Sequence, residues 1–367
     1  MSDRFHRNEA GEEKYLVLHE FIKEARKKLN HNTWDYLIGG TESETTVARN
    51  RAALDAVALR PRVLTDVSRV DPGADFFGHR IAMPVVLAPV GSLESFEAGA
   101  GASVARGAGA AGVPFMLSSV SQPGIEETAE AASGPKIFQL YVRGDVAWRD
   151  DIARRVIACG YDAFAITVDT AHYSRRERDI SKRFVKSWRA ANTGMDVQAA
   201  LSWEDIRRFR DTHNIPLILK GIGTAEDAAI AVEHGVEVIY VSNHGGRQLD
   251  HGRGSLDVLA EVVQAVDGRA KIMVDGGISR GTDIVKAVAM GADWVGIGRL
   301  YLYALAADGA DGVTRLLKIL EDEVVKALGL TGVNSFAELT PDHVHRGAPM
   351  VAFPNVHSAF PLLKEGY

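Results

Sequence analysis

The sequence predicts a (β/α)8 TIM-type barrel with an N-terminal helical cap, and two observations lead to this α/β fold class. From about residue 84 onward, short apolar runs alternate with helical patterns, and eight such units follow one another. Continuous apolar strands separated by helices are typical of a parallel sheet buried on both faces. Eight units favour a closed barrel over an open, doubly wound sheet. Polar residues follow the runs, at the strand ends where barrels place their active sites.

Each predicted strand precedes a small-residue or amphipathic helix. In the helix expected at residues 224–232, Thr224 can cap the first turn. The predicted strands span residues 84–88, 114–117, 136–141, 163–168, 216–219, 238–241, 271–274 and 294–297. The polar residues at their ends are Ser118, Gln139, Tyr141, Thr167, Asp169, Lys220, His244, Asp275 and Arg299.

About eighty residues precede the first strand, and we expect them to form the cap. Helical patterns occupy residues 13–29, 34–39 and 42–54. The first of these carries an apolar stripe that includes Leu18 and Phe21, which suits packing against the barrel.

One domain is expected over residues 1–367, divided into the cap at 1–80, the barrel at 81–330 and a C-terminal tail at 331–367. The stretch 172–201, between the fourth strand and its helix, is long and polar, and Asn192-Thr193-Gly194 indicates irregular backbone. Excursions of this kind are usually lids or disordered segments.

The composition fits a metabolic enzyme. With 367 residues, 46% of them hydrophobic, the chain can bury a large core. The chain has 42 Lys and Arg against 48 Asp and Glu, so it lacks the excess of basic residues that is typical of nucleic-acid-binding proteins. The single cysteine, Cys159, excludes an intramolecular disulfide and fits a reducing cytosol. No apolar stretch is long enough to span a bilayer, and the polar start is unlike a signal peptide. We expect a cytoplasmic protein without membrane, nucleic-acid or metal partners.

The segment 241–250 is the most informative part of the chain, because it places a base and an anion-binding group three residues apart where an apolar strand ends. The glycines after His244 permit a sharp turn, so His244 and Arg247 are expected to project into one cavity. An imidazole suits proton abstraction and a guanidinium suits a carboxylate. A lone histidine at a strand end is more often a hydrogen-bonded structural residue, and the surrounding segment favours catalysis.

This segment resembles the signature of the FMN-dependent 2-hydroxy-acid oxidases and dehydrogenases, the glycolate oxidase and lactate oxidase family. The resemblance extends from about Trp34 to about Leu328. It implies FMN as cofactor, a small 2-hydroxy acid as substrate and a homotetramer. Its most specific pieces are residues 241–250, Phe138-Gln139-Leu140-Tyr141, Thr167-Val168-Asp169-Thr170, Arg175-Arg176-Glu177, Leu219-Lys220-Gly221 and Asp275-Gly276-Gly277.

The resemblance implies three catalytic residues. In this family the histidine that matches His244 removes the α-hydroxyl proton while the α-hydrogen leaves toward flavin N5. Asp169 matches the carboxylate that orients and stabilises the imidazolium, with a helix-cap or turn carboxylate as the alternative. Tyr141 matches a tyrosine of the polar shell, although it could instead pack at the barrel mouth.

Substrate binding is implied for two arginines and a second tyrosine. Arg176 and Arg247 match the pair that holds the substrate carboxylate, and two guanidinium forks define its orientation better than one. Tyr36 matches the second tyrosine of the polar shell, with packing at the barrel mouth again the alternative.

FMN contacts follow from the same resemblance. Lys220 ends an apolar strand, where burial is expensive unless the ammonium faces an anion, so we expect it at N1–C2=O of reduced FMN rather than at the surface. Asp275 is expected to hold the ribityl hydroxyls, and the loops after the last two strands to bind the phosphate. The other expected contacts are Ser118, Gln139, Thr167 and Ser242 along the isoalloxazine and ribityl chain, and Gly277, Arg280, Gly298 and Arg299 around the phosphate.

Three residues depart from the family pattern. Ser279 stands where relatives usually have Arg, so one phosphate-binding charge is missing or is supplied by Arg280. Gly91 stands where many oxidases have Ala, and glycine there is commoner in members that react poorly with oxygen. Val120 stands where glycolate-type oxidases place Trp, which reshapes the substrate pocket and argues against glycolate.

The expected function is FMN-dependent oxidation of an (S)-2-hydroxy acid to the 2-oxo acid, with electrons passed from FMN to oxygen. The first alternative is a dehydrogenase that uses a quinone or a carrier protein. An FMN-dependent isomerase on the same barrel is more remote, because it would have no evident use for His244 and Arg247. A flavin-binding protein without turnover is disfavoured by the complete polar shell.

Overall fold

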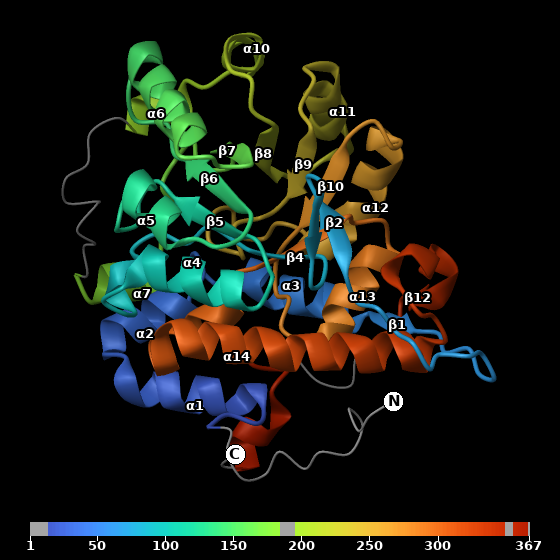
Figure 1. Ribbon diagram of the computed structural model, residues 1–367. Helices are drawn as coiled ribbons and strands as arrows, with labels where there is room; N and C mark the ends of the chain where they lie inside the picture. The colour runs from blue at the N-terminus through green and yellow to red at the C-terminus, as the bar shows by residue number, and fades with distance from the viewer. Residues whose placement is uncertain (1–13, 184–194, 349–354, 366–367) are drawn as a thin grey trace.

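The fold was analysed on a computed structural model that describes residues 14–183, 195–348 and 355–365. Eight parallel strands close into a barrel, with the last strand paired to the first (Figure 1). This arrangement confirms the predicted (β/α)8 fold. In barrel order the strands are β4 (Val85–Leu87), β5 (Phe115–Ser118), β6 (Lys136–Leu140), β7 (Ala163–Thr167), β8 (Leu217–Ile222), β9 (Val238–Val241), β10 (Lys271–Val274) and β11 (Trp294–Ile297).

The predicted strands agree closely with those observed, and the last three agree in both bounds. The largest difference is at β8, which continues past the predicted end at Leu219 to Ile222. Its pairing with β9 is irregular between Lys220 and Ile222, and Gly221 adopts a φ of +114° there. An apolar run cannot reveal this extension, because the added residues include a lysine and a glycine.

A helix follows each strand on the outside of the barrel (Figure 1). The expected cap of α11 is confirmed, since the Thr224 side chain accepts a hydrogen bond from the Asp227 backbone N–H. The helices are α4 (Ala100–Ala110), α5 (Ile125–Ala131), α6 (Val146–Ala158), α10 (Trp203–Thr212), α11 (Ala225–Glu233), α12 (Ser255–Val266), α13 (Gly281–Ala289) and α14 (Arg299–Thr331).

The described N-terminal residues form three helices and three short strands. The helices are α1 (Leu18–Lys28), α2 (His31–Ile38) and α3 (Thr45–Asp55). Leu18 and Phe21 of α1 are buried as the apolar stripe predicts, and α1 packs beside α14 (Figure 1). The strands are β1 (Val57–Leu59), which pairs with β12 (Val344–Arg346) of the tail, and the hairpin of β2 (Ala74–Phe76) and β3 (His79–Ile81).

The hairpin closes the amino-terminal end of the barrel. Phe76 and Ile81 are buried and pack with Val86, Met116 and Trp294 of the barrel strands. The sequence pattern did not predict this hairpin, because three-residue strands are too short to show an alternation. This end of the barrel is therefore covered by packed apolar side chains.

The described residues between β7 and α10 include the short helices α7 (Glu177–Ser181) and α9 (Met195–Ala199). The irregular backbone expected at Asn192-Thr193-Gly194 lies outside the described residues. Short 3-10 turns lie at η1 (Leu93–Ser95), η2 (Phe336–Glu338), η3 (Pro341–His343) and η4 (Pro361–Glu365). Within the described ranges, no helix has the length and apolar character needed to cross a membrane.

Candidate active site

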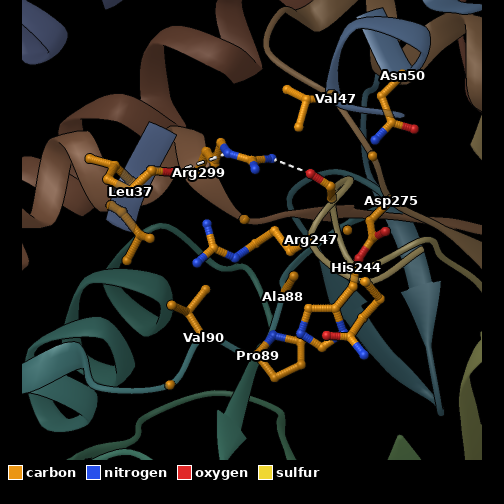
Figure 2. A pocket seen from close by; sticks show the side chains of 18 of the residues that line it. Leu37, Val47, Asn50, Ala88, Pro89, Val90, His244, Arg247, Asp275 and Arg299 are labelled. Carbon is orange, nitrogen blue, oxygen red and sulfur yellow. Dashed lines mark hydrogen bonds between the residues drawn. The ribbon is translucent and has the colours of Figure 1, made fainter. Parts of the chain in front are cut away.

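A cavity opens at the carboxyl-terminal end of the barrel, where the predicted site residues were expected. Its walls come from the segments that follow the barrel strands and from α2, α3 and the C-terminal tail. In the view of Figure 2, Arg299, Arg247 and His244 follow one another from top to bottom, with Ala88, Pro89 and Val90 on one side and Asp275 on the other.

His244 is held at the end of β9 by an unusual backbone. Its φ is +60°, and Gly245 and Gly246 follow with φ of +64° and +77°. A side chain at Gly246 would lie 2.6 Å from the backbone nitrogen of Val47, so this turn requires glycine. The His244 N–H donates to Ser242 Oγ at 3.1 Å, which fixes the start of the turn. The imidazole is thereby directed into the cavity.

The His244 ring lies between an acid and a phenol. Nδ1 is 3.1 Å from Asp169 Oδ1, and Nε2 is 3.2 Å from the Tyr141 hydroxyl. Because an ionised carboxylate only accepts hydrogen bonds, Nδ1 carries the proton and Nε2 presents its lone pair to the cavity. The structure thus brings the three predicted catalytic residues together.

Burial lowers the pKa of His244, and the charges of Lys220 and Arg176 act in the same direction, whereas Asp169 raises it. Burial alone would raise the pKa of Asp169, but the facing His244 and Lys220 outweigh burial and keep it below its usual value. Burial and the charge of Asp169 raise the pKa of the Tyr141 hydroxyl. Near neutral pH the site therefore holds a neutral imidazole, a carboxylate and a protonated phenol.

Arg247 crosses from the β9 segment to the end of α2. Its Nη1 donates to the carbonyl oxygens of Tyr36 at 2.6 Å and Gly39 at 2.8 Å, and its guanidinium lies 4.6 Å from the centre of the Tyr36 ring. The Tyr36 hydroxyl donates to the carbonyl of Gly91 at 3.0 Å. Burial, with a contribution from Arg176, lowers the pKa of Arg247 to about 10, so the group stays charged at neutral pH.

Arg176 reaches the same cavity from the segment after β7. Its guanidinium lies 4.6 Å from the centre of the Tyr173 ring, and Nη2 is 3.5 Å from Gln248 Oε1. Only 7% of Arg176 is exposed. Two guanidinium groups, one of them buried, thus line the cavity together with Tyr36 and His244, which suits binding of a carboxylate.

A buried polar network joins the ends of β8, β9 and β10. Lys220 Nζ donates to Ser242 Oγ at 2.9 Å, and Ser242 Oγ donates to Asp275 Oδ1 at 2.7 Å. Lys220 is 3% exposed, and Asp275 Oδ2 lies 3.7 Å from its ammonium. The predicted burial of Lys220 is confirmed. Lys220 and Asp275 both line the cavity.

A second network lies at the ends of β5, β6 and β7. Ser118 Oγ donates to Gln139 Oε1 at 2.8 Å, and Gln139 Nε2 donates to Thr167 Oγ1 at 2.8 Å. All three residues are almost completely buried and hydrogen-bond to one another. The structure places these predicted cofactor contacts side by side, but none of the three is among the residues that line the cavity.

The glycine-rich ends of β10 and β11 form the far end of the cavity. Gly277 has a φ of +83°, and an added Cβ would lie 3.2 Å from Asn50. An added Cβ at Gly298 would meet nothing within 4 Å, so open space lies over the start of α14. Arg299 donates to the carbonyls of Leu37 at 3.0 Å and Gly245 at 2.8 Å (Figure 2).

Arg280 requires a correction. The sequence grouped it with the cofactor contacts, but its side chain forms a 2.5 Å ion pair with Glu323 of α14 and does not line the cavity. Arg280 is the residue before α13, and the start of that helix turns its side chain away. Ser279, its neighbour, does line the cavity.

Arg51 of α3 lines the cavity and was missed by the sequence reasoning. It binds Asp283 through Nη1 at 2.8 Å and Nη2 at 2.9 Å, and Nη1 also lies 3.3 Å from the Gly277 carbonyl. No motif signalled this role, because Arg51 lies in the cap helix, far in sequence from the barrel ends. The tail residues Val356 and Phe360 were missed for the same reason.

The residues around this cavity fit FMN in their chemistry. A buried ammonium, Lys220, suits the flavin carbonyl edge, and the Asp275 carboxylate can accept from ribityl hydroxyls. The open start of α14, beside Arg299, suits a phosphate. Burial lowers the pKa of Arg299, and an anion beside it would offset that burial. Among the described residues, no cluster of His, Cys, Asp and Glu is arranged to hold a metal.

Comparison with known proteins identifies relatives over nearly the whole chain. The FMN-dependent dehydrogenase family matches residues 25–346. Glycolate oxidase 3 from Oryza sativa subsp. indica is 39% identical over 347 residues, which cover 89% of this chain and 95% of the relative. Glycolate oxidase from Spinacia oleracea is 37% identical over 349 residues, with coverage of 89% and 95%.

Solved structures with the same fold include several of mandelate oxidase. A variant of that enzyme with (S)-mandelic acid superposes with a TM-score of 0.85 at 38% identity, and the match covers 92% of this chain and 100% of the other. A variant with a C4a-OH-FMN adduct gives a TM-score of 0.84 at 38% identity, with coverage of 90% and 100%.

Proposed function

Since this chain belongs to the FMN-dependent dehydrogenase family, we propose that His244 and its neighbours carry out the oxidation of an (S)-2-hydroxy acid to the 2-oxo acid. The cofactor is FMN and the reaction class is FMN-dependent 2-hydroxy-acid oxidation. The observation that carries the assignment of residues is the convergence of the His244–Asp169 pair with Arg176 and Arg247 on one cavity.

The two arginines hold the substrate. Arg176 and Arg247 bind the carboxylate, because both guanidinium groups line the cavity and can each donate two parallel hydrogen bonds to it. The Tyr36 hydroxyl, which burial keeps protonated by raising its pKa, lies on the same wall and donates to the substrate. To make this contact, the Tyr36 hydroxyl gives up its hydrogen bond to the Gly91 carbonyl and donates to the bound acid instead. The carboxylate thereby sets which α-substituent faces His244.

Proton transfer takes place at Nε2 of His244. Its lone pair receives the α-hydroxyl proton, and Asp169 stabilises the imidazolium that results. Tyr141, hydrogen-bonded to Nε2, is placed to donate to the substrate oxygen instead once the substrate enters. Bound FMN supplies the acceptor for the α-hydrogen and its electron pair, so that the alcohol loses two electrons and two hydrogens in all. Lys220 provides positive charge for the reduced flavin edge.

Oxygen is the proposed final electron acceptor, as in the oxidases that the chain resembles. A quinone or a carrier protein is the alternative, favoured by the presence of Gly91 in the cavity wall. The rate at which oxygen reoxidises the reduced holoenzyme distinguishes an oxidase from a dehydrogenase. Fast reoxidation by oxygen supports the oxidase, whereas slow reoxidation together with rapid turnover on an artificial quinone supports the dehydrogenase.

The reaction class is tested by anaerobic addition of (S)- and (R)-2-hydroxy acids to the FMN holoenzyme. Bleaching of the flavin spectrum by the (S)-acids alone is the expected result. No bleaching with any acid of either hand, lactate and mandelate included, would overturn the proposed function.

A cytoplasmic location and a homotetramer stay predictions. The single cysteine supports the first and the family resemblance supports the second. Sedimentation of the holoenzyme tests the assembly, with a mass four times that of the 39.7 kDa chain as the expected result.

A further inference from the structure

Tyr240 carries a buried phenol that neither the proton transfer nor the binding of the substrate carboxylate uses. Alternate residues of β9 face the inside of the barrel, where Val238 and Tyr240 pack with Ile218 and Met273. Tyr240 is the last of these inward residues before β9 ends at Val241, and it is completely buried. It therefore lies at the carboxyl-terminal end of the barrel interior, the end at which the cavity opens.

Gly296 of β11 makes room for the Tyr240 hydroxyl. A Cβ at Gly296 would collide with Oη of Tyr240 and would lie 3.0 Å from Cβ of Asp275. Gly296 and Asp275 both line the cavity. The hydroxyl thus occupies the space that a side chain at Gly296 would take, next to Asp275 and immediately behind the cavity wall.

The Tyr240 ring lies against the Lys220 ammonium. Lys220 on β8 and Tyr240 on β9 are partners in the strand pairing, and Nζ of Lys220 lies 5.2 Å from the centre of the ring. An aromatic ring that faces an ammonium stabilises its positive charge, and this effect is larger away from water. Because Lys220 is buried, the ring replaces part of the hydration that the ammonium has lost.

The Tyr240 hydroxyl keeps its proton and faces Asp275. Burial holds the pKa of Tyr240 well above its ordinary value, and the charge and hydrogen bonding of the Asp275 carboxylate act in the same direction. The contact is looser than an ordinary hydrogen bond, since the hydroxyl has no partner of ordinary length and angle among the described residues. A buried hydroxyl gains stability when an acceptor comes within reach, and the Asp275 carboxylate is the acceptor next to it.

We propose that Tyr240 is a positioning residue for the cofactor, whose ring holds the Lys220 ammonium and whose hydroxyl holds the Asp275 carboxylate. This inference rests on the proposed function, in which Lys220 provides positive charge for the reduced flavin edge and Asp275 accepts from the ribityl hydroxyls. The two parts of the side chain therefore have separate effects. The ring controls how readily bound FMN accepts electrons, and the hydroxyl controls how tightly FMN binds.

Two variants separate the ring from the hydroxyl. Tyr240→Phe keeps the ring against Lys220, so the midpoint potential of bound FMN should stay near the native value. FMN should bind about tenfold more weakly to this variant, because the Asp275 carboxylate loses a donor. Tyr240→Leu removes both contacts and should also lower the midpoint potential, since less positive charge is then held near the reduced flavin.

Flavin fluorescence measures the FMN dissociation constant, and anaerobic titration against redox dyes measures the midpoint potential. A native midpoint potential in FMN-loaded Tyr240→Leu would overturn the role of the ring. A native dissociation constant in Tyr240→Phe would overturn the role of the hydroxyl. Neither measurement uses a substrate, so failure of this inference is distinguished from failure of the proposed function, in which no (S)-2-hydroxy acid reduces the flavin.

Val238→Ala is the matched control for packing, because Val238 lies two residues earlier on β9 in the same buried cluster. It should lower the stability of the fold without changing the midpoint potential or the FMN dissociation constant. Changes in Val238→Ala as large as those in Tyr240→Leu would mean that Tyr240 acts only through the packing of the core, and would overturn the proposal.

The coupling of the ring to the ammonium is tested with Lys220→Met. If the ring acts through Lys220, Tyr240→Leu should lower the midpoint potential of the native protein but not that of Lys220→Met. Equal decreases in the two backgrounds would contradict the proposal.

Discussion

Burial lowers the pKa of both His244 and Arg247, but the two shifts have opposite consequences for their roles. His244 becomes a weaker base than free histidine and stays neutral at pH 7, which leaves Nε2 able to accept a proton. Arg247 falls only to a pKa of about 10 and keeps its charge. One cavity thus holds a neutral base beside a cationic binding group.

The pH profile of kcat/KM follows from these shifts. The base form of His244 is needed, so activity should fall only as the pH drops below the ordinary histidine pKa of 6.5. On the alkaline side, activity should fall as Arg247 loses its charge near pH 10. Asp169→Asn should move the acid limb still lower, because Asp169 raises the pKa of His244. An acid limb above pH 7 in the unmodified enzyme would contradict this account.

Arg247→Met should remove about 2–4 kcal/mol of transition-state stabilisation, because a charge-assisted contact is lost in a dehydrated site. The measurement is kcat/KM for anaerobic flavin reduction. Arg247 also binds the carbonyls of Tyr36 and Gly39, so the FMN content of each variant has to be compared first. Arg247→Lys keeps the positive charge but cannot form two parallel hydrogen bonds. Its kcat/KM should therefore lie between that of the native enzyme and that of Arg247→Met. Unchanged kcat/KM in Arg247→Met would refute the substrate contact.

Gly91 and Val120 are coupled by their packing. A Cβ at Gly91 would lie 2.6 Å from Cγ2 of Val120, so Gly91→Ala must displace the valine. The double variant Gly91→Ala with Val120→Ala adds the methyl group without this clash. If Gly91 controls access of oxygen to the flavin, the double variant should change the rate of reoxidation more than the rate of reduction, relative to Val120→Ala alone. Stopped-flow spectroscopy measures both rates, and equal effects would exclude this role.

At the scale of elements, the loop between β10 and α13 is held in place by contacts with other parts of the protein. Asp283 accepts from the N–H groups of Ser279 at 3.0 Å and Arg280 at 3.1 Å, and it forms a buried ion pair with Arg51 of α3. The cap helix therefore supports the glycine-rich loop that is proposed to bind the phosphate. Breaking a buried pair of this kind leaves an uncompensated charge.

Ser279→Arg should tighten FMN, because Ser279 lines the cavity whereas Arg280 is paired with Glu323. The difference between the FMN dissociation constants of the variant and the native protein should become smaller as salt is added. Ser279→Gln provides a long uncharged control. Equal dissociation constants for the native protein and Ser279→Arg would mean that the backbone amides and Arg299 already satisfy the phosphate.

The same elements show how far the sequence could predict the structure. Buried parallel strands produce continuous apolar runs, so the eight strands and the polar residues at their ends were predictable. The direction of the Arg280 side chain could not be predicted, because adjacent residues such as Ser279 and Arg280 point to different sides at a helix start. Arg51 could not be found either, since an ion pair between α3 and α13 leaves no local pattern.

At the scale of the whole molecule, the cap and the barrel complete the site together. Gly39, at the end of α2, accepts hydrogen bonds from Arg247 at 2.8 Å and Arg299 at 2.7 Å, and Thr41 donates to the Gly246 carbonyl at 3.2 Å. The tail contributes as well, because Phe360 lines the cavity and His357 contacts the Tyr303 hydroxyl. A barrel without these segments would have an incomplete cavity.

The central claim is that His244 removes the α-hydroxyl proton while FMN takes the electrons, and a single-turnover experiment tests it most directly. His244→Gln keeps a polar side chain of similar reach, so the purified variant should retain FMN. Mixed anaerobically with a saturating (S)-2-hydroxy acid in a stopped-flow instrument, it should still bind the acid but reduce the flavin at least about a hundredfold more slowly than the native enzyme. Flavin reduction at the native rate in this FMN-loaded variant would contradict the account.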